Sequence, residues 1–282
     1  MKINKVSITN QKYPKLLKKI GSPPKQLYYL GKWGKKLFKK SLAIVGTRRI
    51  TSYAKRALDQ LIPSLVAEKV TIISGFMYGV DSEAHQKCLE CGGRTMAVLG
   101  SGLNIIYPPE NKKLYQQILK SNGLILSEYE PDVKPQLWTF PQRNRIISGL
   151  ATLGVLIVEA GQKSGSLITA WLAGKQKKKL FALPGPITSS VSAGTNMLIK
   201  SGRAKMVLSA KDILGSKSPS ISKQPAKLDP VEQKICQILE AEPLTIDEIA
   251  HKINQNIIET SKILTMISLK GIIKEENGKY YP

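Results

Sequence analysis

Short runs of apolar residues, followed by longer stretches with helical spacing, dominate the middle of the chain and constrain its fold most. The runs are rich in Val, Ile and Leu and lie at residues 42–46, 70–75, 95–101, 123–129, 151–160 and 179–185. Continuous apolar runs, rather than alternating ones, predict strands that are buried on both faces of a sheet. The stretches between them that are long enough for crossover helices lie at 51–68, 80–91, 109–121 and 166–177. The alternation therefore predicts an α/β fold with a doubly wound, mostly parallel, Rossmann-like sheet.

The C-terminal part of the chain has a different pattern. Residues 215–228 are rich in Ser, Pro and Lys, which indicates a linker. Within residues 229–282 apolar side chains recur at helical spacing, and the closing sequence GIIKEENGKYYP predicts a hairpin that turns at its Asn-Gly pair. Three helices and a hairpin predict a small winged-helix domain. Residues 41–214 are then the Rossmann-like domain, and residues 1–40 are expected to pack on it as a basic lead-in.

The chain carries a large positive charge that is unevenly distributed. Its net charge is +23, and the first 40 residues contain twelve Lys and no acidic residue. Residues 226–282 are slightly acidic instead, with nine Asp and Glu against seven Lys. A field of this sign and size favours a polyanionic partner, most simply nucleic acid. The alternative, a Lys-rich surface that only aids solubility, stays open on charge alone.

Several classes of site and location are disfavoured by the sequence. Three cysteines do not make a disulfide framework, and the Cys88–Cys91 C-x-x-C has neither a second pair nor a His at ligand spacing, so no metal site is expected. The loops lack both the P-loop signature and G-x-G-x-x-G, so neither an ATPase nor a nicotinamide cofactor is indicated. No run approaches 18 apolar residues and the N-terminus has no apolar signal region. We therefore expect a cytoplasmic protein without a membrane partner and without a cofactor.

Small and polar residues gather where the predicted strands end. GTRR (46–49) follows the first strand, SGFMYGVD (74–81) the second, and EAGQKSGSL (159–167) the fifth. Because the carboxyl ends of parallel strands meet at one edge of the sheet, these loops should form a single ligand site. The Ser-Gly-Ser loop also opens a helix, whose free N–H groups and dipole favour a phosphate. The two arginines of GTRR suit phosphate recognition and stacking on bases.

The segment SEYEPDVKPQLWTFPQRNRIISGL (127–150) brings aromatic rings and arginines to the same edge. It leaves the fourth strand, passes three prolines, and starts the next helix. A positive groove with aromatic faces is what a single-stranded nucleic acid requires, since phosphates follow the charge and bases stack on the rings. Phe140 is the favoured stacking ring, because it lies three residues before Arg143; Trp138 is as easily a core residue as a ligand contact.

Taken together and in order, these loops resemble the DprA/Smf family of DNA-processing proteins of natural transformation. The matching segments are AIVGTRR, IISGFMYGVDSEAH, GGRTMAVLGSGLNIIYPPEN, LILSEYEP, FPQRNRIISGL, VLIVEAGQKSGSLITA, FALPGPI and GTNMLIKSG. They cover about residues 10–214, and the C-terminal segment is similar to the winged-helix module that many members carry. One departure is Tyr78, which stands where the family usually has a basic residue.

The resemblance implies an extended Rossmann-like domain that binds and protects single-stranded DNA, forms a homodimer, and helps to load a RecA-type recombinase. Family motifs and loop chemistry together define the candidate nucleic-acid-binding residues. They are Gly46, Thr47, Arg48, Arg49, Ser74, Gly75, Phe140, Arg143, Asn144, Arg145, Lys163, Ser164, Gly165 and Ser166. No catalytic residue is expected among them.

Two alternatives remain. The same kind of fold also serves phosphoribohydrolases, which look to need a carboxylate on the helix after the Gly-rich loop. Residues 166–179 contain no Asp or Glu. Glu159 precedes the loop, and the sequence does not define the direction of its side chain. The winged helix is the other candidate DNA reader. Its slight negative charge disfavours duplex binding and predicts a protein contact instead.

Overall fold

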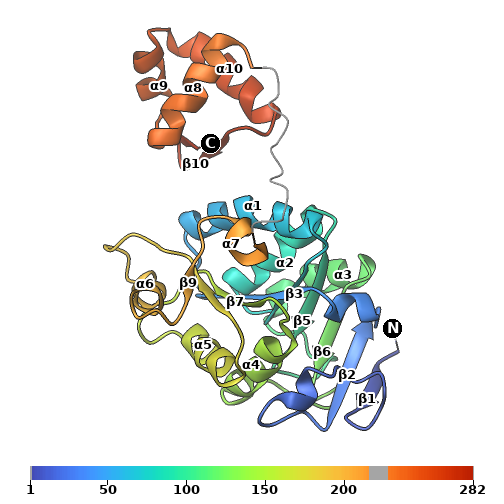
Figure 1. Cartoon of the computed structure of the whole chain (residues 1–282). Helices are drawn as coiled ribbons and strands as arrows, with labels where there is room; N and C mark the ends of the chain where they lie inside the picture. The colour runs from blue at the N-terminus through green and yellow to red at the C-terminus, as the bar shows by residue number, and fades with distance from the viewer. Residues whose placement is uncertain (1, 216–227, 282) are drawn as a thin grey trace. The chain divides into compact units, whose positions relative to one another are not determined.

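Figure 1 shows a computed structural model of the chain, which describes residues 2–215 and 228–281. The chain divides into two compact units, Met1–Ser220 and Ile221–Pro282. The predicted linker, residues 215–228, lies outside the described residues except for its first and last positions.

The first unit is built on one sheet that has nine strands among the described residues. They are β1 (Asn4–Ser7), β2 (Gln26–Gly31), β3 (Ser41–Val45), β4 (Thr71–Ser74), β5 (Arg94–Val98), β6 (Leu124–Ser127), β7 (Gly154–Ile157), β8 (Leu180–Ala182) and β9 (Lys205–Met206). Their order is β1-β2-β6-β5-β4-β3-β7-β8-β9. All neighbours from β6 to β9 are parallel, whereas β2 runs antiparallel to β1 and to β6. The doubly wound, mostly parallel α/β sheet is thereby confirmed.

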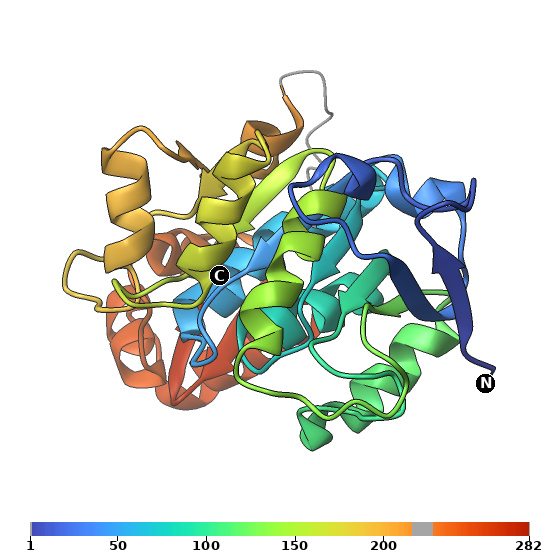
Figure 2. The same cartoon turned by 90° about the horizontal axis from the view of Figure 1, so that it is seen from below.

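Helices cover both faces of this sheet (Figures 1 and 2). One face carries α1 (Ser52–Ala67), α2 (Val80–Glu90), α3 (Lys112–Lys120) and the short α7 (Ala210–Leu214). The other carries α4 (Thr139–Leu150), α5 (Ser166–Lys175) and α6 (Ala193–Lys200). Short 3-10 turns are η1 (Leu17–Lys19), η2 (Lys35–Phe38) and η3 (Pro109–Asn111).

The core follows from the two-residue period of the strands. Successive side chains of a strand point to opposite faces, so each buried strand supplies both layers. In β3, Ala43 and Val45 pack toward α4 and α5, while Leu42 and Ile44 pack toward α1. All four are at most 4% exposed, which explains why the sequence shows a continuous apolar run and no alternation.

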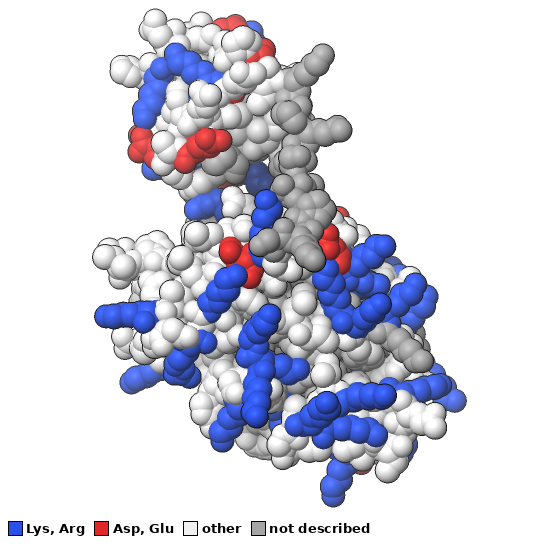
Figure 3. Space-filling view, viewed as in Figure 1, with Lys and Arg blue, Asp and Glu red and all other residues white. Residues whose placement is uncertain are grey.

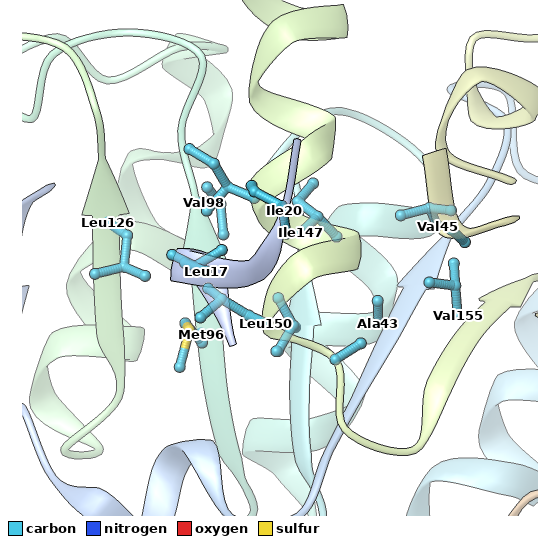
Figure 4. Close-up of a cluster of buried hydrophobic side chains, with 14 of the residues drawn as sticks. Leu17, Ile20, Ala43, Val45, Met96, Val98, Leu126, Ile147, Leu150 and Val155 are labelled. Atoms are coloured by element: carbon cyan, nitrogen blue, oxygen red, sulfur yellow. The ribbon is translucent and has the colours of Figure 1, made fainter. Parts of the chain in front are cut away.

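Helix α4 makes the long crossover of the fold. It connects β6 to β7, although β5, β4 and β3 lie between these two strands in the sheet. Ile147 and Leu150 of α4 are buried against the sheet and also meet Leu17 and Ile20 of the lead-in (Figure 4). The winding direction reverses between β3 and β7, and such a switch point is where open α/β sheets bind their ligands.

The basic lead-in adds strands β1 and β2 to the sheet, and neither was expected from the sequence. β2 pairs with β6 from Tyr28 to Gly31, so the lead-in extends the sheet beyond its parallel part. Leu17 and Leu27 are fully buried. Gly31 has φ +94° where the chain leaves β2, and a Cβ there would lie 2.1 Å from the carbonyl oxygen of Gly123.

The second unit is a winged helix, as predicted. It consists of α8 (Pro230–Ala241), α9 (Ile246–Ile253), α10 (Ile257–Leu269) and the antiparallel pair β10 (Lys274–Glu276) and β11 (Lys279–Tyr281). The side chains of Asp229, Thr245 and Asn256 cap the three helices. Asn277 and Gly278 both have positive φ, which fits the predicted Asn-Gly turn. Within 2–215 and 228–281, none of the helices has the length and hydropathy needed to cross a membrane.

Replacing Gly31 with Ala should lower the free energy of unfolding by about 2–4 kcal/mol, because the new Cβ overlaps a backbone oxygen and the positive φ strains any other residue. Urea unfolding monitored by circular dichroism measures the loss. Gly21→Ala is the matched control, since a Cβ there meets no atom within 4 Å, and it should change stability by about 0.5 kcal/mol at most. Equal stability of the two variants would contradict the packing of β2 on β6.

Candidate nucleic-acid interface

A pocket of about 260 Å³ opens at the carboxyl ends of β3, β4 and β7, beside the first turns of α4 and α5. It brings together residues from three predicted loops that are far apart in the chain. The predicted residues that line it are Gly46, Arg48, Phe140, Arg143, Asn144, Ser164, Gly165 and Ser166. The structure thus confirms the prediction that these loops lie at one edge of the sheet.

The other predicted residues lie around the pocket without lining it. They are Thr47, Arg49, Ser74, Gly75, Arg145 and Lys163. Arg49 and Lys163 are exposed in the flanking loops, and the hydroxyl of Thr47 accepts a hydrogen bond from the Arg49 N–H. Ser74 is buried and donates its hydroxyl to the carbonyl of Ile44 at 2.6 Å, so its role is internal to the sheet.

Arg48 and Phe140 bring a positive charge and an aromatic ring together in the pocket lining. The guanidinium carbon of Arg48 lies 5.6 Å from the centroid of the Phe140 ring. Phe140 is held from behind, because the Tyr107 ring lies 5.8 Å away and a Cβ on Gly100 would come within 2.8 Å of Phe140. A half-buried ring that is packed against its neighbours and lies beside an exposed guanidinium can offer a surface to a base and a charge to a phosphate.

Arg143 is a buried brace rather than an exposed cation. Only 2% of it is exposed, and its Nη1 donates to the carbonyls of Gly75 and Val98, which follow β4 and end β5. Its Nε also donates to Oδ1 of Asn144 at 3.2 Å. The reason is the course of α4: the helix crosses over the strand ends, so the residue one turn after Phe140 faces the sheet. Asn144, a candidate nucleic-acid-binding residue, thus holds the Arg143 side chain in place.

Asp81 is the buried charge that accompanies Arg143. Both flank Gly75, where a Cβ would lie 2.4 Å from Oδ2 of Asp81 and 2.7 Å from Nη2 of Arg143. Burial raises the pKa of Asp81, against the opposing effect of the Arg143 charge, and burial lowers the pKa of Arg143 to about 10. Gly75 is therefore needed to make room for this pair, and not only to let a ligand approach the backbone.

Arg145 serves the fold on the other side of α4. Its guanidinium binds both carboxylate oxygens of Glu128 at 2.6 Å, and its Nε donates to the carbonyl of Ser22 at 2.8 Å. A bidentate, largely buried pair of this kind is already satisfied. Arg145 thus joins α4 to the end of β6 and to the lead-in, and its charge is not presented to the pocket.

The Ser-Gly-Ser loop forms another part of the pocket lining. The hydroxyls of Ser164 and Ser166 lie 2.7 Å apart, and the Ser166 N–H donates to Ser164 Oγ at 3.3 Å. Gly165 is the N-cap of α5, so the positive end of the helix dipole faces the pocket region. The neighbouring Glu159 has a defined direction: its Oε1 accepts from the Thr51 hydroxyl at 2.5 Å and its Oε2 from the Thr51 N–H at 3.2 Å. That carboxylate caps α1.

Among the pocket-lining residues that the candidate set omitted, the exposed large side chains are Tyr78, Leu137 and Ile168. They are 40%, 91% and 41% exposed. The Tyr78 hydroxyl donates to Glu110 at 2.6 Å, and this hydrogen bond to a carboxylate is the main cause that raises the Tyr78 pKa to about 12. Tyr78 lies inside the SGFMYGVD loop and was noted there as a departure from the family pattern. Leu137 and Ile168 are signalled only by their closeness to the motifs, because an exposed leucine or isoleucine looks like a core residue in sequence.

An extended Rossmann-like domain with a basic and aromatic pocket at its switch point, followed by a winged helix, defines a class of α/β binding proteins. The family model for DNA recombination-mediator protein A matches residues 4–217, and the DprA winged-helix model matches residues 219–279. The chain belongs to the DNA recombination-mediator protein A family, and the resemblance to DprA/Smf proteins is confirmed.

The similarity extends over most of the chain. Protein Smf of Synechocystis sp. is 35% identical over 95% of this chain and 77% of its own length. The X-ray structure of DprA from Streptococcus pneumoniae has a TM-score of 0.72 and 39% identity, covering 77% of this chain and 75% of that one. The structure that addresses the single-stranded DNA binding mode of DNA processing protein A from Helicobacter pylori has a TM-score of 0.67 and 36% identity, covering 76% and 94%.

Replacing Arg143 with Met should lower the free energy of unfolding by about 3–5 kcal/mol, because two buried carbonyls lose their donor and buried Asp81 loses the nearby positive charge. Arg49→Met, at an exposed position, should cost about 0.5 kcal/mol at most. Urea unfolding compares the two. Adding Asp81→Asn to Arg143→Met should recover part of the loss, as a double-mutant cycle would reveal. Additive effects would mean that the two charges do not interact.

Proposed function

We propose that the chain binds single-stranded DNA, without sequence preference, in the pocket at the strand ends. The observation that carries the proposal is the Arg48 guanidinium over the fixed Phe140 ring, beside the Ser164–Ser166 loop at the start of α5. The loop and the helix end offer donors to a phosphate, and the ring offers a face to a base. The related H. pylori protein, whose structure addresses single-stranded DNA binding, supports the same ligand here.

The charge of the surface supports a long anionic ligand over a small one. Figure 3 shows Lys and Arg spread over the visible face of the α/β unit, with far fewer Asp and Glu. A field of one sign over a broad surface raises the rate of encounter with a polyanion and lets it bind along a path rather than at a point.

We also propose the role in recombination. The chain would protect single-stranded DNA and help to load a RecA-type recombinase, acting in the cytoplasm as a homodimer. The family description as a recombination mediator supports the role. For the dimer, the support is the sheet edge near α6 and β9, where Met197, Met206 and Leu208 are 53%, 43% and 70% exposed. Large apolar side chains gathered at an edge strand are typical of a surface that packs against another chain.

We propose no catalytic step for the pocket. The carboxylate nearest to the Gly-rich loop, Glu159, is bound to Thr51, and Asp81 is buried beside Arg143. Helix α5 carries no Asp or Glu. A phosphoribohydrolase-like reaction would need a carboxylate that faces a sugar from this loop or helix, so binding accounts for the geometry better.

Replacing Phe140 with Ala should weaken binding of labelled oligo-dT by about 1–3 kcal/mol, the contribution of one stacked base. Arg48→Ala should weaken it too and reduce the slope of log affinity against log salt by about 0.7, the value for one phosphate on a single strand. Fluorescence anisotropy at several salt concentrations measures both. Arg203→Ala, an exposed arginine outside the pocket, is the control. A flat salt slope for the unmodified chain, or a preference for duplex, would refute the proposal.

Deleting residues 226–282 should leave the affinity for oligo-dT nearly unchanged. Residues 226–282 carry nine acidic residues against seven Lys, and α10 exposes Ile258, Met266 and Leu269, which are 70%, 54% and 79% exposed. Such a surface suits a protein contact better than a phosphate backbone. Anisotropy with the same oligonucleotide tests the truncated chain, and a loss of tenfold or more would show that the winged helix is part of the DNA site.

A further inference from the structure

A second and larger cavity lies at the opposite end of the parallel strands. Its volume is about 1150 Å³, and its walls come from the lead-in, between Thr9 and Lys18 and between Tyr29 and Lys39, with Leu150 at the end of α4. This cavity, here called the lead-in groove, is separate from the strand-end pocket, and the function proposed above makes no use of it.

The charge of the lead-in groove is positive on every side. Lys12, Lys15, Lys18 and Lys39 line it, and all four are exposed. Among the described residues that line the groove, none is acidic. The lining therefore carries four positive charges and no negative one, which favours an anionic ligand. A solvated lysine surface needs no concave shape, so the groove itself points to a ligand.

Aromatic rings form one part of the groove. The rings of Tyr29 and Trp33 contact each other at a tilt of 44° with their centroids 4.5 Å apart, and the Trp33 and Phe38 centroids are 5.2 Å apart. All three line the groove and are half-buried, so each is fixed by packing while part of it stays accessible. Ammonium groups around fixed rings repeat the chemistry of the strand-end pocket: charges for phosphates and faces for bases.

We propose that the lead-in groove binds a second stretch of the single strand that occupies the strand-end pocket. This inference rests on the function proposed above and adds a second contact region to it. The two sites lie at the two ends of α4, since Phe140 lines one and Leu150 lines the other. At a rise of 1.5 Å per residue these positions are about 15 Å apart, a distance that a few nucleotides of an extended single strand cover. An oligonucleotide only a few residues longer than the pocket needs would reach the groove.

Oligo-dT of two lengths tests the proposal on the full chain, one of about 3 nucleotides, too short to reach from the pocket to the groove, and one of about 20. The variant is the quadruple change Lys12→Gln, Lys15→Gln, Lys18→Gln and Lys39→Gln. It should bind the short oligonucleotide like the unmodified chain and the long one about tenfold or more weakly. For the long oligonucleotide its salt slope should also fall by up to about 3, since each lost phosphate contact removes about 0.7.

A second quadruple variant removes the same charge elsewhere. It replaces Lys55, Lys113, Lys120 and Lys211 with Gln; these are exposed lysines on α1, α3 and α7, which cover the other face of the sheet. The proposal requires this control to bind the long oligonucleotide more tightly than the groove variant. Equal losses in both variants, or an equal loss for short and long oligonucleotides, would overturn it. Failure of the unmodified chain to bind either length would instead refute the function itself.

Trp33 gives an independent readout. The chain has three tryptophans, so Trp138→Phe with Trp171→Phe leaves Trp33 as the one fluorescent indole. The long oligonucleotide should quench its emission and the short one should not. Bound long oligonucleotide with unchanged Trp33 emission would show that bases do not reach the rings of the groove.

Discussion

The buried guanidinium of Arg143 is the interaction on which the binding pocket depends. It ties the first half of α4 to the carbonyls at the ends of β4 and β5, next to the buried Asp81. A charge pair without solvent must be held by good geometry, and its loss leaves several groups unsatisfied at once. The helix that it fixes carries Phe140 in its first turn and closes the core further along, through Ile147 and Leu150. Arg143 thus stabilises both the pocket and the packing of α4 on the sheet.

The three arginines of this region have different roles because their side chains point in different directions. Arg143 faces the sheet and is buried, Arg145 faces Glu128 and the lead-in, and Arg48, on a separate loop, remains to meet a ligand. The positive charge of the pocket is therefore smaller than the motifs suggest. The surrounding field comes instead from the many exposed lysines, which act at longer range and are more sensitive to salt. The pocket residues therefore define the shape of the site, whereas the exposed lysines supply the long-range attraction for an anionic ligand.

Much of the fold could be predicted because its signal is local. The apolar run at Leu42–Val45, buried on both sides, and the Asn277-Gly278 turn each define their own structure. The switch-point pocket followed from the strand order that such runs imply. The burial of Arg143 could not be predicted, because it depends on the angle at which α4 crosses the strand ends. β1 and β2 were missed as well: β1 is short and mostly polar, the apolar run of β2 covers only residues 27–30, and the strand that β2 joins, β6, lies far along the chain.

The pairing of β2 with β6 has a consequence for how the chain is made. Synthesis delivers the lead-in first, but the strand that it must join, Leu124–Ser127, emerges only after β3, β4 and β5. Until β6 has been synthesised, the lead-in cannot pair with the sheet. Its twelve lysines, with no acidic residue, keep it solvated during that time. Lysine on a waiting edge strand opposes pairing with other chains. The composition that attracts DNA to the finished protein would thus also guard the nascent chain against aggregation on the ribosome.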